Sequence, residues 1–242
     1  MNTTAVVIEA VPAATGDSRS PALTCIVVDD HPGVLGAAAR YLARRGVAVV
    51  ATAATGASAL TAALERTPDV VVVDLLMPGF TGGGLVAALR EVSPRSRSIA
   101  YTGFGGHDEV VGALSAGAKG ALLKGTSLVA LYEAVTTVGA GSVYLEQSLT
   151  DELLDSGGGE TRPSLEDRAA VGQLLRGRSP AAVAAERGIA VVELTRTVTA
   201  VIDRLCLTPG TAAAGAALRG LLGLDAQHPL PSARGGSGSG CA

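Results

Sequence analysis

The stretch Val70-Val-Val-Val-Asp-Leu-Leu-Met-Pro-Gly79 decides the fold of this chain. Its run of valines has the length of one strand and contains no charge, which is typical of a strand buried on both faces of a parallel sheet. An acid, Asp74, ends the run. We therefore expect a carboxylate at the carboxyl end of a central strand.

Similar apolar runs recur on both sides of this stretch. They occupy residues 23–28, 47–52, 98–102 and 120–123, and amphipathic helical patterns alternate with them at 33–45, 57–65, 83–92, 108–116 and 127–138. Five strands alternating with five helices predict a doubly wound α/β domain around a five-stranded parallel sheet, spanning residues 22–138.

The rest of the chain divides by composition. Residues 1–21 have no sustained periodicity and are predicted to be a flexible extension, and residues 225–242, rich in Pro, Gly and Ser, a disordered tail. Residues 139–162 are predicted to be a linker that ends in a Gly triplet and holds a short helix at 147–154. Helical patterns at 164–175, 180–187, 191–205 and 211–222 predict a small all-α domain over residues 163–224.

Polar side chains follow the predicted strands where each one ends. Asp29 and Asp30 follow the first strand and Asp74 ends the third, while Thr102 ends the fourth and Lys124 follows the fifth. Ligands bind at the carboxyl ends of parallel strands, so these five side chains should converge. Close carboxylates need a cation, and an all-oxygen site suits Mg²⁺. A hydroxyl, an ammonium and a metal around one carboxylate are what phosphoryl transfer to that carboxylate requires.

Residues 23–138 resemble the receiver domains of two-component response regulators, which have a flavodoxin-like fold. The resemblance rests on four motifs: Val27-Val-Asp-Asp-His-Pro32, Val73-Asp-Leu-Leu-Met-Pro-Gly79, Tyr101-Thr-Gly103 and Gly120-Ala-Leu-Leu-Lys-Gly125. It implies that Asp74 accepts a phosphoryl group from a sensor histidine kinase, and that Thr102 and Lys124 bind the phosphoryl oxygens. It also implies that Asp29, Asp30 and Asp74 hold Mg²⁺ together with the backbone carbonyl of Leu76.

One position departs from this family pattern. Receiver domains usually carry an aromatic residue three positions before the lysine, where it moves inward as the threonine shifts, but this chain has Ala121. We therefore predict that Ala121, as the switch position, transmits phosphorylation with weak or altered coupling.

The all-α segment places a short helix, a Gly turn and a longer helix in succession, which predicts a helix-turn-helix. On the longer helix an apolar stripe should face the core; its members are Val191, Leu194, Val198, Val201, Ile202 and Leu205. The segment resembles the LuxR-type DNA-binding domain, and its place after a receiver resembles the NarL/FixJ class. The expected DNA contacts are Thr195, Arg196, Thr197 and Arg204. By the same resemblance, residues 211–222 form the helix of a homodimer.

The match is looser in this domain, because Glu193 places an acid where DNA is expected. Residues 163–224 carry a net charge of +2 and the remainder −5, so any DNA-binding face belongs to this segment. A helical bundle that docks or dimerises therefore stays open as an alternative.

Composition excludes several classes of protein. No run approaches the roughly 20 apolar residues of a membrane span, and three scattered cysteines suit neither a disulfide framework nor a metal cluster. We expect a cytoplasmic regulator, not an enzyme or a membrane protein, that binds promoter DNA as a dimer. Two rivals remain: a phosphorylated adaptor whose helical domain binds a protein, and an orphan regulator that is not controlled by phosphorylation.

Overall fold

The computed structural model describes residues 22–103, 107–155, 163–208 and 210–224. The predicted extension at 1–21, the predicted tail at 225–242 and the Gly triplet of the linker lie outside the described residues. No helix in the described ranges is both long and apolar enough to cross a membrane.

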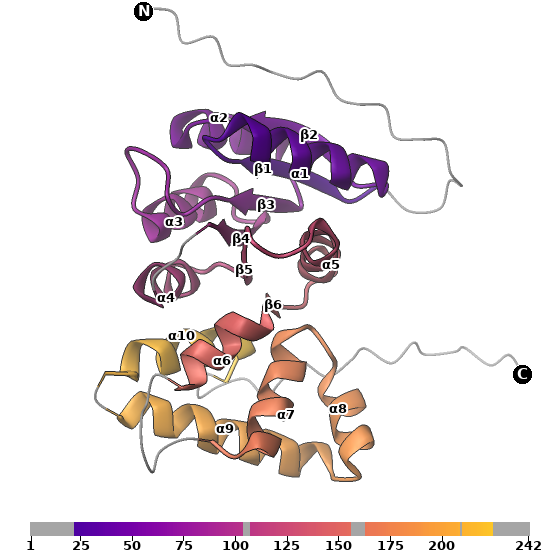
Figure 1. The fold of residues 1–242 in the computed structure, drawn as a ribbon, viewed down its shortest axis with the longest axis vertical. Coiled ribbons are helices and arrows are strands. Elements are labelled where there is room, and N and C mark those ends of the chain that lie inside the picture. The colour runs from indigo at the N-terminus through magenta and orange to yellow at the C-terminus, as the bar shows by residue number, and fades with distance from the viewer. Residues whose placement is uncertain (1–21, 104–106, 156–162, 209, 225–242) are drawn as a thin grey trace, which may run out of the picture.

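The first part of the chain forms one sheet of parallel strands in the order β2-β1-β3-β4-β5-β6 (Figure 1). The strands are β1 (Thr24–Val28), β2 (Ala48–Ala53), β3 (Val70–Val73), β4 (Arg97–Thr102), β5 (Gly120–Leu123) and β6 (Tyr144–Leu145). The predicted doubly wound sheet is confirmed, and the structure adds a sixth strand that lies within the predicted linker.

Helices cover both faces of this sheet. They are α1 (Pro32–Arg44), α2 (Gly56–Arg66), α3 (Gly82–Val92), α4 (His107–Ser115) and α5 (Leu128–Gly139). Side chains of α1 and α5 pack on one face, and those of α2, α3 and α4 on the other. The β3 valines are fully buried between these layers, as their unbroken apolar run requires.

The short strand β6 lies along the outer edge of β5. Its backbone is held by hydrogen bonds from the amide of Tyr144 to the carbonyl of Lys119 and from the amide of Glu146 to the carbonyl of Ala121, each 3.0 Å. The close approach requires Gly120, since a Cβ atom there would lie 2.8 Å from the carbonyl oxygen of Tyr144. The segment that leaves the sheet is therefore anchored to it.

The helical part comprises α6 (Gln147–Asp155), α7 (Leu165–Leu175), α8 (Pro180–Arg187), α9 (Val191–Leu207) and α10 (Ala212–Leu222). Ser164 and Ser179 cap α7 and α8 by accepting backbone N–H groups, and Gly188 ends α8 in the left-handed conformation at φ +66°. The predicted stripe of α9 is buried except at Val191, which is 41% exposed. That expectation was wrong at Val191, because this residue begins the helix and its side chain is left partly open to solvent.

Helix α10 is an element of the helical part that contacts α4 on the sheet. It packs on α9 and on α4, and one continuous apolar cluster joins α4, β5, β6 and the helical part. Gly215 allows the close approach to α9, since a Cβ atom there would lie 2.6 Å from the backbone nitrogen of Cys206. Helix α9 itself lies on the side of the helical part that faces away from the sheet (Figure 1).

Candidate functional site

The polar residues predicted to converge lie along one edge of the sheet. Asp29 follows β1, Asp74 follows β3, Thr102 is the last residue of β4, and Lys124 follows β5. The sheet's hydrogen bonding continues past the strand ends: the amide of Asp74 donates to the carbonyl of Val28 at 3.0 Å, and that of Lys124 to the carbonyl of Thr102 at 2.8 Å. Regular backbone pairing therefore fixes where these side chains begin.

Three carboxylates meet at this edge. Asp29, Asp30 and Asp74 each offer an oxygen within 4.8 Å of the others. Asp29 and Asp74 are 1% and 4% exposed, whereas Asp30 is open to solvent. A cluster of oxygen ligands with one side toward water fits Mg²⁺, which keeps several of its waters when a protein binds it. The predicted fourth ligand, the Leu76 carbonyl, stays a prediction.

Lys124 neutralises the two buried acids. Its Nζ lies 2.6 Å from Oδ2 of Asp29 and 2.8 Å from Oδ2 of Asp74. Burial works to lower the pKa of Lys124, but hydrogen bonds and charge attraction from both carboxylates outweigh it and raise this pKa above its usual value. The ammonium is therefore charged throughout the neutral range.

Backbone amides orient both acids. Oδ1 of Asp29 accepts from the amide of His31 at 2.9 Å, and Oδ1 of Asp74 accepts from the amide of Leu76 at 3.0 Å. Each buried carboxylate thus binds a backbone N–H with one oxygen and faces Lys124 with the other. This arrangement leaves little rotational freedom to the Asp74 carboxylate.

The Thr102 side chain is buried without a partner. The residue is 0% exposed, and its hydroxyl makes no hydrogen bond with any residue in the described ranges. An unsatisfied buried hydroxyl costs about 1–3 kcal/mol, so such groups call for an explanation. A phosphoryl oxygen would satisfy this one.

The switch position Ala121 is fully enclosed. It is 0% exposed and pairs with Ala100 of β4 on one side and Leu145 of β6 on the other. The coupling predicted for this position stays a prediction, but the structure shows what occupies its surroundings: β6 and the apolar cluster that continues into α6.

Glu146 also contributes to this region, although the sequence motifs do not include it. Its Oε2 accepts from the backbone amide of Leu123 at 2.7 Å, directly before Lys124. No local pattern marks this glutamate, because it lies in the connector and reaches β5 only when β6 has formed.

The expected DNA contacts all lie on α9. Arg196 and Arg204 are exposed, while Thr195 and Thr197 are half-buried, and the Thr195 hydroxyl donates to the carbonyl of Val191 at 2.9 Å. The other arginines of residues 163–224 each contact an acid or an amide oxygen: these are Arg168, Arg176, Arg178, Arg187 and Arg219. Within the described residues, Arg196 and Arg204 are thus the arginines of this part that contact neither an acid nor an amide oxygen.

The sheet, the acidic edge and the lysine define the receiver domain of a response regulator. Residues 25–136 match the family model described as response regulator receiver domain. The chain is also 30% identical over 203 residues to the probable transcriptional regulatory protein NarL of Mycobacterium tuberculosis, a match that covers 80% of this chain and 93% of that protein. This chain therefore belongs to the response regulators of the NarL type.

Other relatives match over a smaller share of their length. The nitrate/nitrite response regulator NarL of Escherichia coli K12 is 31% identical over 140 residues, which cover 57% of this chain and 64% of that protein. The oxygen regulatory protein NreC of Staphylococcus epidermidis is 34% identical over 132 residues, covering 54% and 61%. The matched regions thus span less than two thirds of these two proteins.

Solved structures share the fold. A two-component response regulator of the LuxR family from Aurantimonas sp. SI85-9A1 superposes with a TM-score of 0.51 at 32% identity, covering 55% of this chain and 98% of that chain. The response regulator RcsB of Salmonella typhimurium gives a TM-score of 0.53 over 81% of this chain and 98% of its own, at 20% identity. The latter likeness concerns the fold alone.

Proposed function

We propose that this response regulator accepts a phosphoryl group on Asp74 from a sensor histidine kinase, and that it controls transcription by binding promoter DNA as a homodimer. The observation that carries the first half is the meeting of Asp74 with Lys124 and the unpartnered hydroxyl of Thr102 at one sheet edge. The proposed role is that of a regulator in the cytoplasm and not that of an enzyme.

The chemistry follows from the positions of the charges. A carboxylate oxygen of Asp74 attacks phosphorus, the bond from phosphorus to the kinase histidine nitrogen breaks, and an acyl phosphate forms. Lys124 and Thr102 are placed to hold the phosphoryl oxygens, on which negative charge is spread. Mg²⁺ held by Asp29, Asp30 and Asp74, with the Leu76 carbonyl, supplies further positive charge when it is bound.

Phosphorylation can be tested directly. Incubation with Mg²⁺ and acetyl phosphate, followed by intact mass measurement, should show one added phosphoryl group on the wild type and none on Asp74→Asn. A wild-type protein that stays as unmodified as this control would refute the proposal. That result would instead favour the orphan regulator, for which the departure at Ala121 is the specific observation.

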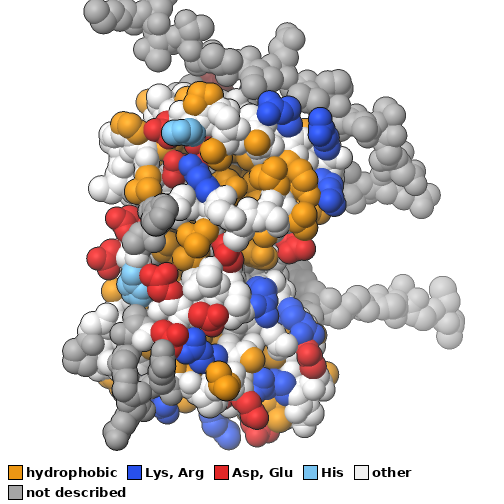
Figure 2. All heavy atoms as spheres, in the orientation of Figure 1, with side chains coloured by type: hydrophobic (Ala, Val, Ile, Leu, Met, Phe, Trp, Pro, Cys, Tyr) orange, Lys and Arg blue, Asp and Glu red, His pale blue; other side chains and the backbone are white. Residues whose placement is uncertain are grey.

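The DNA-binding half rests on α9. The helix lies on the side of the helical part that faces away from the receiver (Figure 1), and it carries the two arginines of the described residues 163–224 that contact neither an acid nor an amide oxygen. Yet basic and acidic side chains alternate over the helical part on the face drawn in Figure 2, so this face shows no large basic patch. We therefore expect modest affinity with a shallow salt dependence, since few phosphates are neutralised.

A gel shift against promoter fragments at low salt tests this reading. The wild type should bind, and Arg196→Ala and Arg204→Ala should each weaken binding, with Arg178→Ala as a control because Arg178 is paired with Glu186. If neither the phosphorylated nor the unphosphorylated wild type shifts any fragment, the adaptor with a protein partner becomes the better reading.

Dimerisation is proposed to depend on α10. In this structure α10 packs against α4 of the same chain, and we propose that this contact loosens before two copies pair through α10. Because α4 follows the strand that ends at Thr102, movement of Thr102 toward a phosphoryl group acts on the same region. Sedimentation with and without beryllofluoride should show a shift toward dimer with the analogue. An unchanged sedimentation profile would contradict this part.

A further inference from the structure

We propose that Glu146 is a positioning residue that holds the strand end bearing Lys124 and connects it to the helical part through α6. The inference rests on the proposed phosphorylation of Asp74 and names the route by which that event reaches the second part of the chain. Neither the receiver motifs nor the comparisons point to this residue.

Glu146 is bonded on two sides. Toward the sheet, its Oε2 accepts from the amide of Leu123 at 2.7 Å, and its own amide donates to the carbonyl of Ala121 at 3.0 Å. Toward α6, its carbonyl accepts from both the amide and the hydroxyl of Thr150, at 2.9 and 3.0 Å, and its Oε1 accepts from the hydroxyl of Ser148 at 2.9 Å. One residue therefore joins β5 to the first turn of α6.

The sheet side of this connection leads to the phosphoryl-acceptor site. Leu123 immediately precedes Lys124, whose amide donates to Thr102 and whose Nζ lies between Asp29 and Asp74. A phosphoryl group on Asp74 changes what the ammonium binds, and any adjustment of the Lys124 backbone must move the Leu123 amide as well. That amide is donated to a charged acceptor, the stronger class of hydrogen bond.

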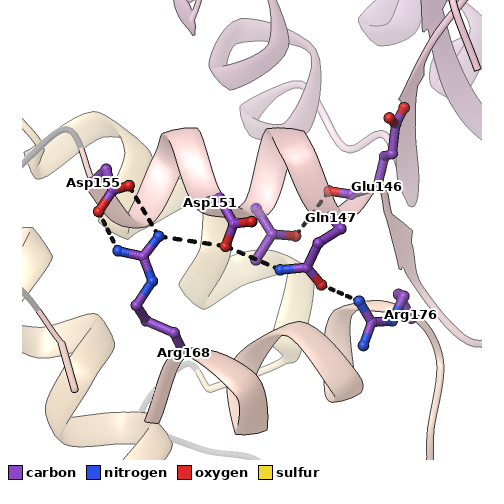
Figure 3. A network of polar contacts seen from close by, with 7 residues as sticks. Glu146, Gln147, Asp151, Asp155, Arg168 and Arg176 are labelled. Carbon is purple, nitrogen blue, oxygen red and sulfur yellow. Dashed lines mark hydrogen bonds and ion pairs between the residues drawn. The ribbon is translucent and has the colours of Figure 1, made fainter. Parts of the chain in front are cut away.

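The far side of the connection leads into α7, as Figure 3 shows. Asp151 accepts from the side-chain amide of Gln147 at 3.0 Å, and Arg168 of α7 binds both Asp151, at 3.4 Å, and Asp155. Arg176 at the end of α7 binds the amide oxygen of Gln147. A shift of the start of α6 is thus passed to both ends of α7.

The route through Glu146 explains how phosphorylation can act on the helical part although residue 121 is an alanine and not an aromatic residue. A methyl group enclosed by β4 and β6 has no second rotamer to adopt, so it cannot signal by moving inward or outward. The carboxylate of Glu146 instead contacts the backbone of the same strand two residues further along. We therefore place the moving contact at Glu146 and not at the side chain of residue 121.

The test compares four proteins. Glu146→Ser keeps a residue able to cap α6 but is too short to reach Leu123, and Glu146→Gln keeps an acceptor for that amide without the charge. The matched control is Glu152→Ser, because Glu152 is an exposed acid of the same helix with no bonded partner among the described residues. Phosphorylation by acetyl phosphate is followed by intact mass. Hydrogen exchange of α6 and α7 amides is measured with and without Mg²⁺ and beryllofluoride.

We expect all four proteins to take up the phosphoryl group. In the wild type, Glu146→Gln and Glu152→Ser, the analogue should change exchange in α6 and α7, whereas in Glu146→Ser the change should fall by about fivefold or more, the lower range of measured coupling between sites. Rescue by glutamine separates the specific contact from general damage to the helix.

Three outcomes would overturn the proposal while leaving phosphorylation of Asp74 intact: a wild-type response in Glu146→Ser, a glutamine variant as defective as the serine variant, or no response of α6 and α7 in the wild type. A wild type that takes up no phosphoryl group overturns the proposed function itself. If Glu146→Ser does not fold, Arg168→Ala decides, because it opens the α7 end without touching β5. It should reduce the response at the start of α7, where Arg168 lies, and keep that of α6, and an unchanged response at the start of α7 counts against the route.

Discussion

Replacing Ala121 by tyrosine restores the kind of residue that receiver domains usually carry at this position, and we predict that it destabilises this protein. Ala121 is 0% exposed, lies between β4 and β6, and belongs to the apolar cluster shared with the helical part. A phenol ring at this position has no solvent to enter while β6 stays paired. The chain must either strain its core or release β6.

Both routes can be given a magnitude. Forcing extra atoms into a packed core costs typically about 1–3 kcal/mol. Releasing β6 breaks the hydrogen bonds from Tyr144 to Lys119 and from Glu146 to Ala121, and separates Glu146 from Leu123, at roughly 0.5–1.5 kcal/mol each or somewhat more for the charged one. The chain adopts whichever response is less unfavourable, so we expect the free energy of unfolding of Ala121→Tyr to fall by about 2 kcal/mol. This corresponds to a melting temperature lower by about 4–8 °C.

Urea unfolding followed by circular dichroism measures this loss, with Ala57→Tyr as the control because Ala57 is exposed on α2. The control should unfold within about 0.5 kcal/mol of the wild type, as surface substitutions usually do. If Ala121→Tyr is as stable as that control, the position has free space and our account of a closed β5 edge is wrong.

Three further predictions concern buried groups. Burial raises the pKa of the Cys25 thiol from 9.0 to about 12, so this thiol ionises in the unfolded chain before it ionises in the folded one. The free energy of unfolding is therefore unaffected by Cys25 below about pH 9. It should fall between about pH 9 and 12, by up to ~4 kcal/mol. Urea titrations at rising pH should show this slope weakened in Cys25→Val. Thr102→Val removes an unsatisfied hydroxyl, so it should leave urea stability unchanged or raise it by ~1–3 kcal/mol, while slowing phosphorylation by acetyl phosphate in intact mass measurements; a clear loss of stability would mean that the hydroxyl already has a partner. Gly215→Val should lower the melting temperature markedly by pushing α10 off Cys206, whereas the same change at the open position Gly220 should leave stability unchanged or raise it by a few tenths of a kcal/mol, because valine has a higher helix propensity than glycine.

The sequence predicted those features that depend on one segment at a time. The unbroken valines of β3 indicated a doubly buried strand, and an acid at the end of such a strand must lie at the sheet edge whatever the rest of the chain does. For that reason the sequence alone places Asp29, Asp74, Thr102 and Lys124 together.

Features that depend on two distant segments escaped the sequence analysis. The strand β6 is two residues long, too short for periodicity, and it pairs only because Gly120 leaves room for Tyr144. The contact of Glu146 with Leu123 follows from that pairing. The exposure of Val191 was missed for a related reason, since helical periodicity gives a direction around the axis but not how far the neighbouring layer extends.

The pairing of β6 with β5 also bears on how such a protein could be divided or recombined. A receiver fragment that ended at residue 138 would leave β5 as the outermost strand, with its backbone N–H and C=O groups open along a mostly apolar edge. Bare edges of this kind invite pairing between molecules and aggregation. A fragment extended through Glu146 would carry its own edge cover, and this connector would have to travel with the receiver in any exchange of effector domains.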